Sequence, residues 1–238
     1  MSEKRALPRL TPRLAAVASQ VRPGARLLDV GTDHAYLPAF LVGTGICPAA
    51  VASDVREGPC ARARATVEAL HLEDRIRVVR ADGLQGHNLQ EIDDIVLAGM
   101  GGELMLSILG QVPQVRCKRL RLILQPQTEL AAVRKTMTGW GFELAGEYLA
   151  AEGRRLYHIM RFAYDDGTPH SLDRAQAEFG RPEADAALLA ACRERQRASL
   201  TREFEGLSRS TAPDHGRMAE LRELLELLTK SNGIKSRG

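Results

Sequence analysis

The sequence contains few cysteines. The four that it has, Cys47, Cys60, Cys117 and Cys192, are widely spaced, and none belongs to a C-x-x-C pair. Because zinc sites and disulfide frameworks have characteristic cysteine spacings, this pattern indicates neither of them. We therefore expect no metal, and the cytoplasm is the simplest compartment for such a chain.

Long apolar runs are also absent. No segment of the 238 residues approaches the length of a membrane span. The first residues contain no long apolar stretch, so we expect neither a secretory signal nor a membrane partner. Hydrophobic residues still make up 44% of the chain. That content suffices for a substantial core in one mid-sized domain with an appendage.

Neither sign of charge is in strong excess, since the formal net charge is +3. The basic residues are nevertheless concentrated. Residues 1–28 hold six of them against Glu3 alone, a net +5, so the remainder carries −2. A second basic cluster, at 116–121, precedes an apolar run. Such clusters fit contact with a phosphate backbone as well as ordinary solvation, and charge alone does not decide. Arg9 and Arg13 are the foremost candidates for phosphate contact.

The glycine fingerprint of a dinucleotide-binding loop is missing too, although its framework is present. The apolar run 26–30 predicts a buried parallel strand, and Gly31 permits a sharp turn before a helical pattern that begins near Ala35. Instead of further glycines, Thr32, Asp33 and His34 follow. An acid here would repel a pyrophosphate but would suit S-adenosylmethionine, which carries a sulfonium and an ammonium group. The alternative is that Asp33 only caps the next helix.

Strand and helix patterns alternate along the next stretch of the chain. Apolar runs predict strands at 26–30, 51–53, 76–79, 92–98, 120–124, 142–149 and 156–162, with Ala151-Glu152-Gly153 between the last two. Helical spacing is found at 10–21, from 35, and at 57–70, 103–109 and 128–139. This alternation predicts a doubly wound α/β sheet. The terminal hairpin is typical of the Rossmann-like class I methyltransferase sheet, whose last strand is antiparallel.

Candidate binding residues follow several of these strands. Asp54 lies 23 residues after Gly31, where an acid is suited to accept hydrogen bonds from ribose hydroxyls, although it would also cap a helix. Asp82-Gly83 follows the third strand and is either an adenine contact or an ordinary turn. The fourth strand is followed at once by Gly99-Met100-Gly101-Gly102, where the glycines leave the backbone bare for a ligand. Gln125-Pro126-Gln127 follow the fifth strand.

The composition changes after residue 163. A linker at 165–169 leads into a long helical pattern at 184–207, and Pro213 lies in the break at 210–214. Met218, Leu221, Leu225 and Leu228 then repeat at heptad spacing. We therefore predict two domains, 1–163 and 164–238, the second an antiparallel helical hairpin with a coiled-coil-like seam and a basic tail from Lys230.

Together, these motifs resemble the bacterial tRNA (adenine-22, N1)-methyltransferase family of the TrmK type. The resemblance rests on LLDVGTDHAYLP at 27–38, Asp82-Gly83, LAGMGGELM at 97–105 and LILQPQ at 122–127. It covers about the first two-thirds of the chain, and the helical hairpin matches in architecture only. Membership implies a class I fold that binds S-adenosylmethionine and methylates N1 of an adenine in the D-loop of tRNA.

The resemblance also implies roles for individual residues. The cofactor positions fall on Asp29, Gly31, Asp33, His34, Asp54, Asp82, Gly83, Gly99, Met100 and Gly101. The substrate or RNA positions are Gly102, Pro126 and Gln127, to which charge adds Arg9 and Arg13. One departure is that LQPQ stands where LQPN is expected, but the Gln127 amide retains the same donor and acceptor groups.

We expect in-line transfer of the sulfonium methyl group to adenine N1, with alignment as the main contribution of the protein. The target base is expected to leave its stack, and nearby acids to stabilise the cationic product. Asp33, His34 and Gln125 are the candidate catalytic groups. His34 either accepts a proton from the adenine amino group or only hydrogen-bonds the loop or the cofactor.

Two other functions stay open from the sequence. They are a small-molecule methyltransferase and a non-catalytic adaptor that binds the cofactor and recruits a partner through the hairpin. A dehydrogenase fits least, because the loop after Gly31 lacks the remaining glycines. The sequence does not indicate an oligomeric state.

Overall fold

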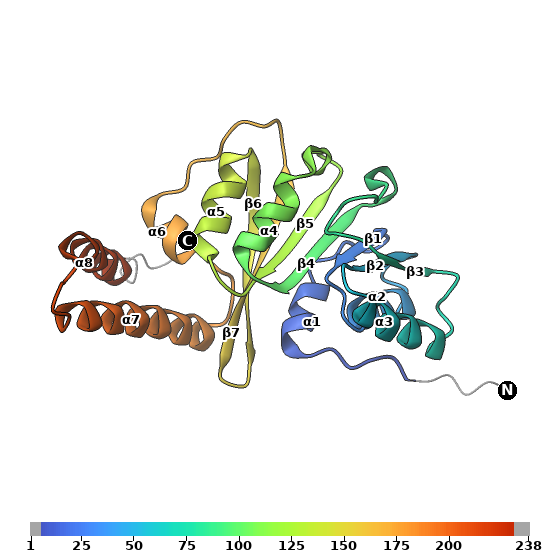
Figure 1. Cartoon of the computed structure of the whole chain (residues 1–238), viewed down its shortest axis with the longest axis horizontal. Coiled ribbons are helices and arrows are strands. Elements are labelled where there is room, and N and C mark those ends of the chain that lie inside the picture. The colour runs from blue at the N-terminus through green and yellow to red at the C-terminus, as the bar shows by residue number, and fades with distance from the viewer. Residues whose placement is uncertain (1–5, 231–238) are drawn as a thin grey trace.

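A seven-stranded mixed sheet forms the centre of the protein (Figure 1). The structure, a computed structural model, describes residues 6–230, so Lys4 and Arg5 of the basic N-terminal cluster and the tail after Lys230 lie outside the described residues. The strand order is β3-β2-β1-β4-β5-β7-β6. The strands are β1 Leu27–Val30, β2 Ala50–Asp54, β3 Ile76–Arg80, β4 Asp94–Met100, β5 Arg121–Pro126, β6 Phe142–Glu152 and β7 Arg155–Tyr164.

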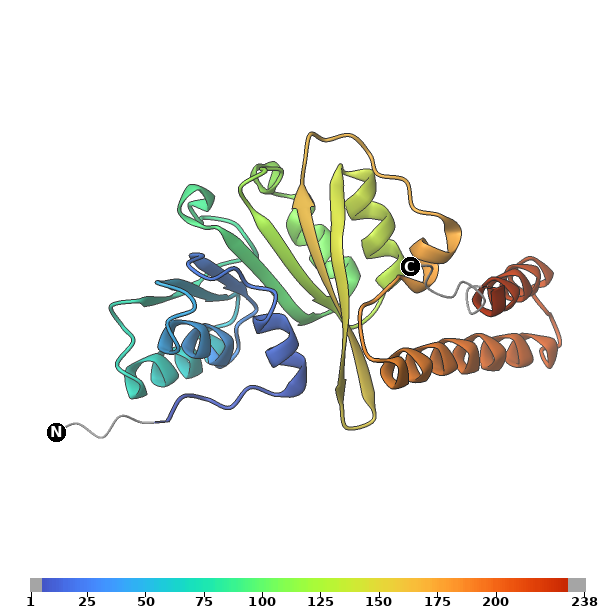
Figure 2. The ribbon, with the colours of Figure 1, turned by 180° about the vertical axis from the view of Figure 1, so that it is seen from behind.

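The first five strands are parallel, and β7 lies antiparallel between β5 and β6. The predicted class I methyltransferase architecture is therefore confirmed. The predicted turn was misplaced, because β6 continues through Ala151 and Glu152, and only Gly153 and Arg154 connect the strands. Gly153 has a φ of +58°, which permits so short a connection. The hairpin extends beyond the other strands at one end of the sheet (Figure 2).

Helices cover both faces of the sheet. One apolar core packs α1 Pro12–Ala18, α2 Tyr36–Gly43 and α3 Glu57–Ala69 against one face, and it includes Leu27. The other core packs α4 Gly102–Gly110 and α5 Leu130–Gly139 against the opposite face, and it includes Leu28. Successive strand residues point to opposite faces, so both must be apolar in a doubly covered sheet. Two short 3₁₀ turns, η1 Leu89–Glu91 and η2 Pro113–Val115, lie in the connections.

The first helix is shorter than predicted. Thr11 forms its N-cap and accepts a hydrogen bond from the Leu14 amide through Oγ1, and Pro12 occupies the first helical position. Leu10 and Val21, which were included in the predicted helix 10–21, therefore lie outside it, although both contact the core.

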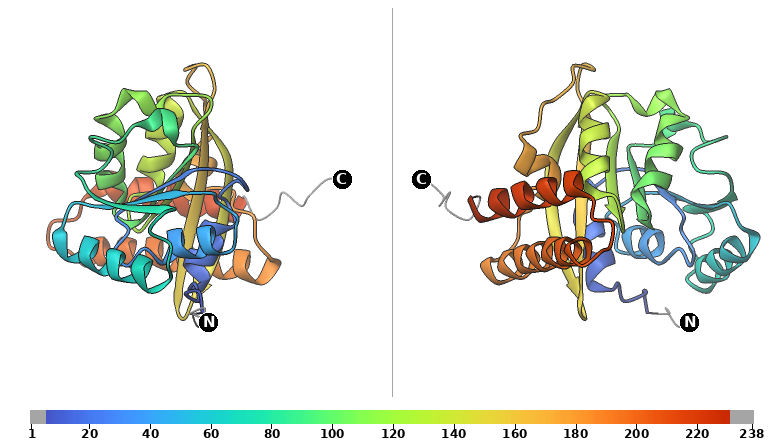
Figure 3. Two further views of the ribbon diagram at one scale, coloured as in Figure 1. Left: turned by 90° about the vertical axis from the view of Figure 1, so that its right-hand side faces the viewer. Right: turned by 60° about the vertical axis from the view of Figure 1, so that its left-hand side comes forward.

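The C-terminal part contains α6 Arg174–Phe179, α7 Ala186–Ser208 and α8 His215–Lys230. The last two lie side by side, as the predicted helical hairpin requires (Figure 3). In α8 the fully buried residues are Leu221, Leu224 and Leu228. The predicted seam was thus wrong at Leu225, which is only partly buried, because the helix turns Leu224 inward instead. The sequence pattern did not predict α6, whose capping box joins Asp173 and Gln176.

A buried ionic cluster connects the sheet to these C-terminal helices. Arg134 of α5 donates from Nη2 to Glu147 of β6 at 2.6 Å, and Nδ1 of His158 in β7 lies 2.6 Å from the same carboxylate. Arg134 Nη1 also donates to the carbonyl oxygens of Ala177 and Glu178, each at 3.2 Å. These bonds cross the predicted boundary between 163 and 164, and the division into two domains stays a prediction.

Candidate functional site

The predicted site residues converge at the carboxyl edge of the parallel strands. In the register, Val30 is level with Ser53 of β2 and with Leu97 of β4, and Ala98 is level with Gln125 of β5. We call the residues that the strand ends bring together here, Asp29, Gly31, Asp54, Gly99 and Gln125, the strand-tip site. It lies where the strand order reverses between β1 and β4. In open α/β sheets such a switch point is where ligands bind.

The loop after β1 adopts left-handed backbone conformations at alternate residues. Gly31 has a φ of +78°, Asp33 of +43° and Ala35 of +54°. The amides of Gly31 and Thr32 both donate to the Ser53 carbonyl, at 2.7 and 3.0 Å, which anchors the loop on β2. Of the three residues with positive φ in this loop, only one is a glycine. Alanine is strained in this conformation, which aspartate tolerates better, and such strain is concentrated at functional sites.

Asp33 does not cap the following helix. The N-cap of α2 is Ala35, and no side chain bonds to that helix end. Asp33 instead accepts hydrogen bonds from Nε and Nη2 of Arg62 in α3, and this pairing lowers the pKa of the Asp33 carboxyl. Its side chain is half exposed. The negative charge that suggested a cationic ligand is thus already paired with a cation.

His34 lies beside Asp33 and against Tyr36. Its Nε2 is 3.6 Å from Asp33 Oδ2, and its ring stacks on that of Tyr36 with the centroids 5.1 Å apart. These contacts account for the orientation of the ring without a substrate. The proton-accepting role of His34 stays a prediction.

Asp29 supplies a buried carboxyl group beneath this loop. Burial raises its pKa to about 6, while the Thr32 hydroxyl and the Arg13 guanidinium oppose that rise and Asp54 adds to it. A cationic ligand group nearby would favour the ionised carboxylate. Asp29 is therefore the acid suited to a cationic ligand group, a role that the sequence suggested for Asp33.

Asp54 is buried at the end of β2. Its Oδ1 accepts a hydrogen bond from the Arg56 amide at 2.9 Å. The N-cap of α3 is Arg56, and no side chain caps that helix. The alternative prediction, that Asp54 caps the helix, was therefore wrong. Within residues 6–230, its Oδ2 has no hydrogen-bond partner and remains available to a ligand.

Arg13 reaches the strand-tip site from α1. Its Nη1 donates to Gln125 Oε1 at 2.9 Å, and its guanidinium lies 5.7 Å from the centre of the Tyr157 ring. A methyl group on Gly99 would lie 3.3 Å from the same Nη1. Gln125 is fully buried, and its Nε2 donates to the Pro126 carbonyl at 3.1 Å. The arginine predicted to contact phosphate therefore lies among the candidate cofactor residues, and its role stays a prediction.

Glycine occupies the positions after β4 for different structural reasons. Gly99 forms a bulge with a φ of +81°. A Cβ at Gly102 would lie 2.7 Å from the Thr128 carbonyl oxygen, so this glycine lets α4 pack against the segment that starts α5. Met100 O accepts a hydrogen bond from the Gln127 amide at 3.0 Å, which joins the loops after β4 and β5. Gly101 lies between Met100 and Gly102 in the chain. The substrate role predicted for Gly102 stays a prediction.

The remaining predicted residues lie nearby or at the rim. Asp82 is exposed, and the Ala81 amide donates to the Asp54 carbonyl at 3.0 Å, which holds the end of β3 beside β2. Gly83 follows with a φ of +58°. Gln127 is exposed beyond the buried Pro126, and Arg9 is exposed in the N-terminal segment.

Three exposed apolar residues and one cation near the site were not predicted from the sequence. Tyr36, Val55 and Leu104 are the exposed large hydrophobic residues of the described chain, and each follows a strand that contributes to the site. Val55, directly after Asp54, could have been found as an apolar residue next to a candidate ribose acid. Arg62, the partner of Asp33, gave no signal, because its helix position alone does not indicate a contact with the loop.

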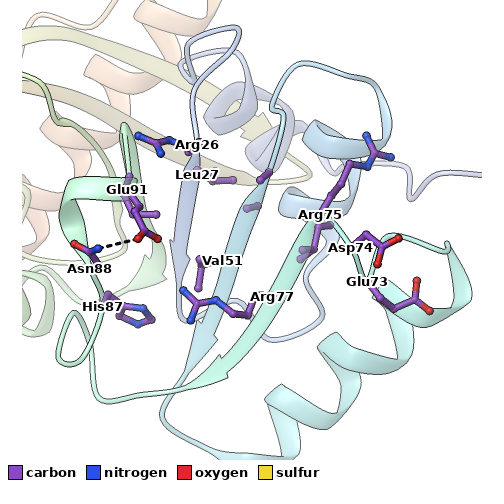
Figure 4. A pocket seen from close by; sticks show the side chains of 14 residues that line it. Arg26, Leu27, Val51, Glu73, Asp74, Arg75, Arg77, His87, Asn88 and Glu91 are labelled. Carbon is purple, nitrogen blue, oxygen red and sulfur yellow. Dashed lines mark hydrogen bonds between the residues drawn. The ribbon is translucent and has the colours of Figure 1, made fainter.

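A separate hollow of about 280 Å³ lies at the opposite, amino edge of the strands (Figure 4). Its lining mixes basic and acidic side chains, including Arg26, Arg77 and Glu91. His87 at its edge lies 3.1 Å from Ser53 Oγ, and burial lowers the pKa of this histidine. None of the predicted site residues lines it. Across 6–230, no cluster of three or more potential ligands is arranged to hold a metal, and no helix is long and apolar enough to span a membrane.

Known proteins resemble this chain over nearly its whole length. A family model described as a methyltransferase domain matches residues 10–160. The tRNA (adenine(22)-N(1))-methyltransferase of Bacillus subtilis is 30% identical over 92% of this chain and 95% of its own. The crystal structure of the B. subtilis m1A22 tRNA methyltransferase TrmK is 28% identical over 94% and 99% of the two chains, with a TM-score of 0.83.

A further solved structure contains a ligand. It is a putative tRNA (m1A22) methyltransferase from Streptococcus pneumoniae in complex with S-adenosyl-L-methionine. It is 30% identical to this chain, covers 93% of it and 99% of its own length, and has a TM-score of 0.81.

Proposed function

The chain belongs to the tRNA (adenine(22)-N(1))-methyltransferase family, and from this premise we propose that it transfers a methyl group from S-adenosylmethionine to N1 of adenine 22 in tRNA. The likeness to the B. subtilis enzyme over 92% of this chain and 95% of that one carries the proposal. Because the likeness includes the C-terminal helices, it is greater than a shared cofactor domain would give. The proposed partner is tRNA, and the proposed compartment is the cytoplasm.

The residues of the strand-tip site fit S-adenosylmethionine. Asp54 offers a free carboxylate oxygen to ribose hydroxyls, exposed Val55 offers an apolar surface to an adenine ring, and Asp82 offers an acceptor to its amino group. Gly31 and Gly99 allow a ligand to approach the backbone closely. When bound, the cofactor supplies an electrophilic methyl group on a positively charged sulfur.

The methionine part of the cofactor needs partners for one cation and one anion. Asp29 is a buried carboxyl group suited to the ammonium. Arg13 is suited to the carboxylate, because it is the guanidinium that lies at Gly99 and Gln125. We assign it this role in place of the phosphate contact that the sequence suggested. Gln125 then acts as a positioning residue, since both of its polar atoms hold Arg13 or the chain.

The acceptor atom requires alignment more than proton removal. Adenine N1 already carries a neutral lone pair, so it can attack without a general base. Holding the two reactants in line can by itself supply several kcal/mol. Gly102, Pro126 and Gln127 border the site on the side of β4 and β5, where the acceptor base would enter. We assign His34 to the support of the loop, because its contacts are to Asp33 and Tyr36.

A labelling experiment with matched RNAs tests this function. The protein is incubated with methyl-labelled S-adenosylmethionine and either a tRNA that has adenine 22 or the same tRNA with guanine there. We expect label only in the first, as 1-methyladenosine at position 22. Label in a small-molecule extract but not in tRNA would favour the metabolite methyltransferase instead. Binding of the cofactor without methylation of either tRNA or of the extract would favour the non-catalytic adaptor.

A further inference from the structure

A second hollow lies beside the strand-tip site without being part of it. Its volume is about 650 Å³, and it is an open depression bordered by the N-terminal segment, the loop after β1 and helix α3. That volume is within the range of small-ligand pockets, about 300–1,000 Å³. Asp29, Asp54 and Gly99 do not line it. It is therefore not accounted for by the residues assigned to the cofactor.

An aromatic pair forms one wall of the hollow. Tyr36 and His34 are stacked with an interplanar angle of 20°, and Tyr36 is 43% exposed. The stack orders both rings in advance, so a third flat ring adds to it at a low entropic cost. Small and apolar side chains complete the lining, among them Pro8 and, from α3, Ala65, Ala69 and Leu70.

The charges at the rim are positive. Arg9 lines the hollow, is exposed and has no ion-pair or hydrogen-bond partner among the described residues. Arg62, on the other side, is neutralised by Asp33. Among residues 6–230, no acidic side chain lines the hollow. A ligand that combines a flat ring with a negative charge complements these features.

We propose that this hollow binds an unpaired nucleotide of the tRNA, with its base stacked on Tyr36 and its phosphate beside Arg9. The inference rests on the proposed function, and it adds the place on the protein where the RNA is held. A peptide is the less complementary occupant, since the hollow offers a stacked aromatic wall and an unpaired cation rather than backbone hydrogen-bond partners. His34 joins the two sites, because it belongs to the loop after β1 and also to the aromatic wall.

Substitution of Tyr36 tests the stacking. Tyr36→Ala should weaken binding of a full-length tRNA transcript about ten- to a hundredfold, the range of one base–aromatic stack. Tyr36→Phe keeps the ring and should restore binding. Calorimetry with S-adenosylhomocysteine should give the same affinity for all three proteins. In steady-state assays the alanine variant should raise KM for tRNA and leave kcat nearly unchanged.

Spectroscopy and salt dependence give independent readouts. Trp140 is the only tryptophan, so Tyr36→Trp in a Trp140→Phe background reports on this site alone, and tRNA should quench its emission. Arg9→Gln should reduce the slope of tRNA affinity against salt by about one. Arg77→Gln is the matched control, because it removes one exposed cation from the hollow at the opposite edge of the strands (Figure 4) and should leave the slope unchanged.

The outcomes separate this inference from the function on which it rests. If the wild type methylates adenine 22 but Tyr36→Ala binds tRNA as tightly as the wild type does, the nucleotide site is wrong and the function stands. If Tyr36→Ala lost affinity for S-adenosylhomocysteine as strongly as for tRNA, Tyr36 would belong to the cofactor site, and the proposed nucleotide site would be overturned. If the wild type leaves tRNA unlabelled, the function itself fails.

Discussion

At the scale of single residues, the strand-tip site depends on an acid and a cation that differ in how they reach it. Asp29 comes from the adjacent strand and is buried under the loop that follows it. Arg13 comes from the helix before that strand and is held by Gln125, which lies 112 residues later in the sequence. The pair gives complementary charges for an amino-acid group, and each member can be tested separately.

Arg13→Met should selectively weaken ligands that carry the amino-acid carboxylate. We expect affinity for S-adenosylhomocysteine to fall about tenfold to a hundredfold, the loss typical of a hydrogen bond to a charged group. Affinity for 5′-methylthioadenosine, which lacks the amino-acid group, should change little. Calorimetry with both ligands measures the difference, and Arg77→Met is a control for loss of charge. Equal losses for the two ligands would rule out a carboxylate contact.

Asp29 should make cofactor binding dependent on pH. Its pKa in the folded protein is about 6, above its ordinary 3.8, so ionisation costs folding free energy as the pH rises between these values. The charged groups around it are Arg13 of α1 and Asp54 of β2. A bound ammonium group favours the ionised form, so affinity for S-adenosylhomocysteine should rise about tenfold from pH 5 to pH 7.

The isosteric variant Asp29→Asn is the control for that dependence. It cannot ionise, so its affinity should be weaker at pH 7 and nearly flat over the same range. A wild-type affinity that falls as the pH rises would contradict the assignment of Asp29 to a cationic group.

At the scale of elements, the contact between the sheet and the C-terminal helices depends on the cluster of Arg134, Glu147 and His158. Burial alone would raise the pKa of Glu147, but His158 and Arg134 hold it below its usual value. The ionised carboxylate therefore contributes stability above a pH of about 4.5, and that contribution is lost as the pH falls. Gly180 passes so close that a Cβ there would lie 2.7 Å from Arg134 Nη2.

Glu147→Gln should destabilise the protein by about 3–5 kcal/mol, because it leaves the Arg134 guanidinium buried without its counter-charge. The free energy of unfolding is measured in urea by Trp140 fluorescence. Glu223→Gln is the matched control, since it removes an exposed carboxylate that pairs with Arg174 and should cost less than about 1 kcal/mol. A similar loss of unfolding free energy in both variants would mean that the buried pair contributes no more to stability than an exposed one.

Elements with a strong local signal were predictable from the sequence, and elements set by distant contacts were not. The apolar runs that became β1 and β5 were predicted because buried parallel strands are continuously apolar. The turn at Gly153 was misplaced since strand length in the hairpin is set by pairing across it. The inward position of Leu224 instead of Leu225 depends on packing against α7, which heptad spacing alone does not determine.

The same distinction applies to the site. Asp54 and Gly99 were found because a short motif follows each strand. The location of Arg13 was not, because an exposed phosphate contact and a cation held at Gly99 by Gln125 have the same sequence signature. Asp33 was assigned the charge that Asp29 supplies, since the pairing with Arg62 arises only when α3 packs beside the loop.

At the scale of the whole molecule, stability should be uneven along the C-terminal hairpin. Cys192, near the start of α7, is the only fully buried residue of that helix. Its Sγ lies 3.6 Å from His158 Nε2, so this end is fixed to the sheet. The other end, at 205–216, is largely exposed. Segments with few buried contacts open at a lower free energy than the core.

Hydrogen exchange measures this gradient directly. Amides near Cys192 in α7 and near Leu228 in α8 should exchange more slowly than those at 205–216, because opening them exposes buried side chains. Glu147→Gln should reduce protection chiefly around Cys192. Uniform protection along both helices would instead indicate a hairpin that opens as one unit.

The packing of α1 has a consequence for synthesis on the ribosome. The Arg13 amide donates to Glu152 of β6, and Arg161 of β7 donates to Gln20, so the earliest helix is docked by the last strands of the sheet. At a translation rate of about 5–20 residues per second, Arg13 waits on the order of ten seconds for these strands to emerge. A nascent chain stalled before β7 thus already has the acids of β1 and β2 but not the docked arginine, and methyl-donor affinity should appear only when the hairpin is complete.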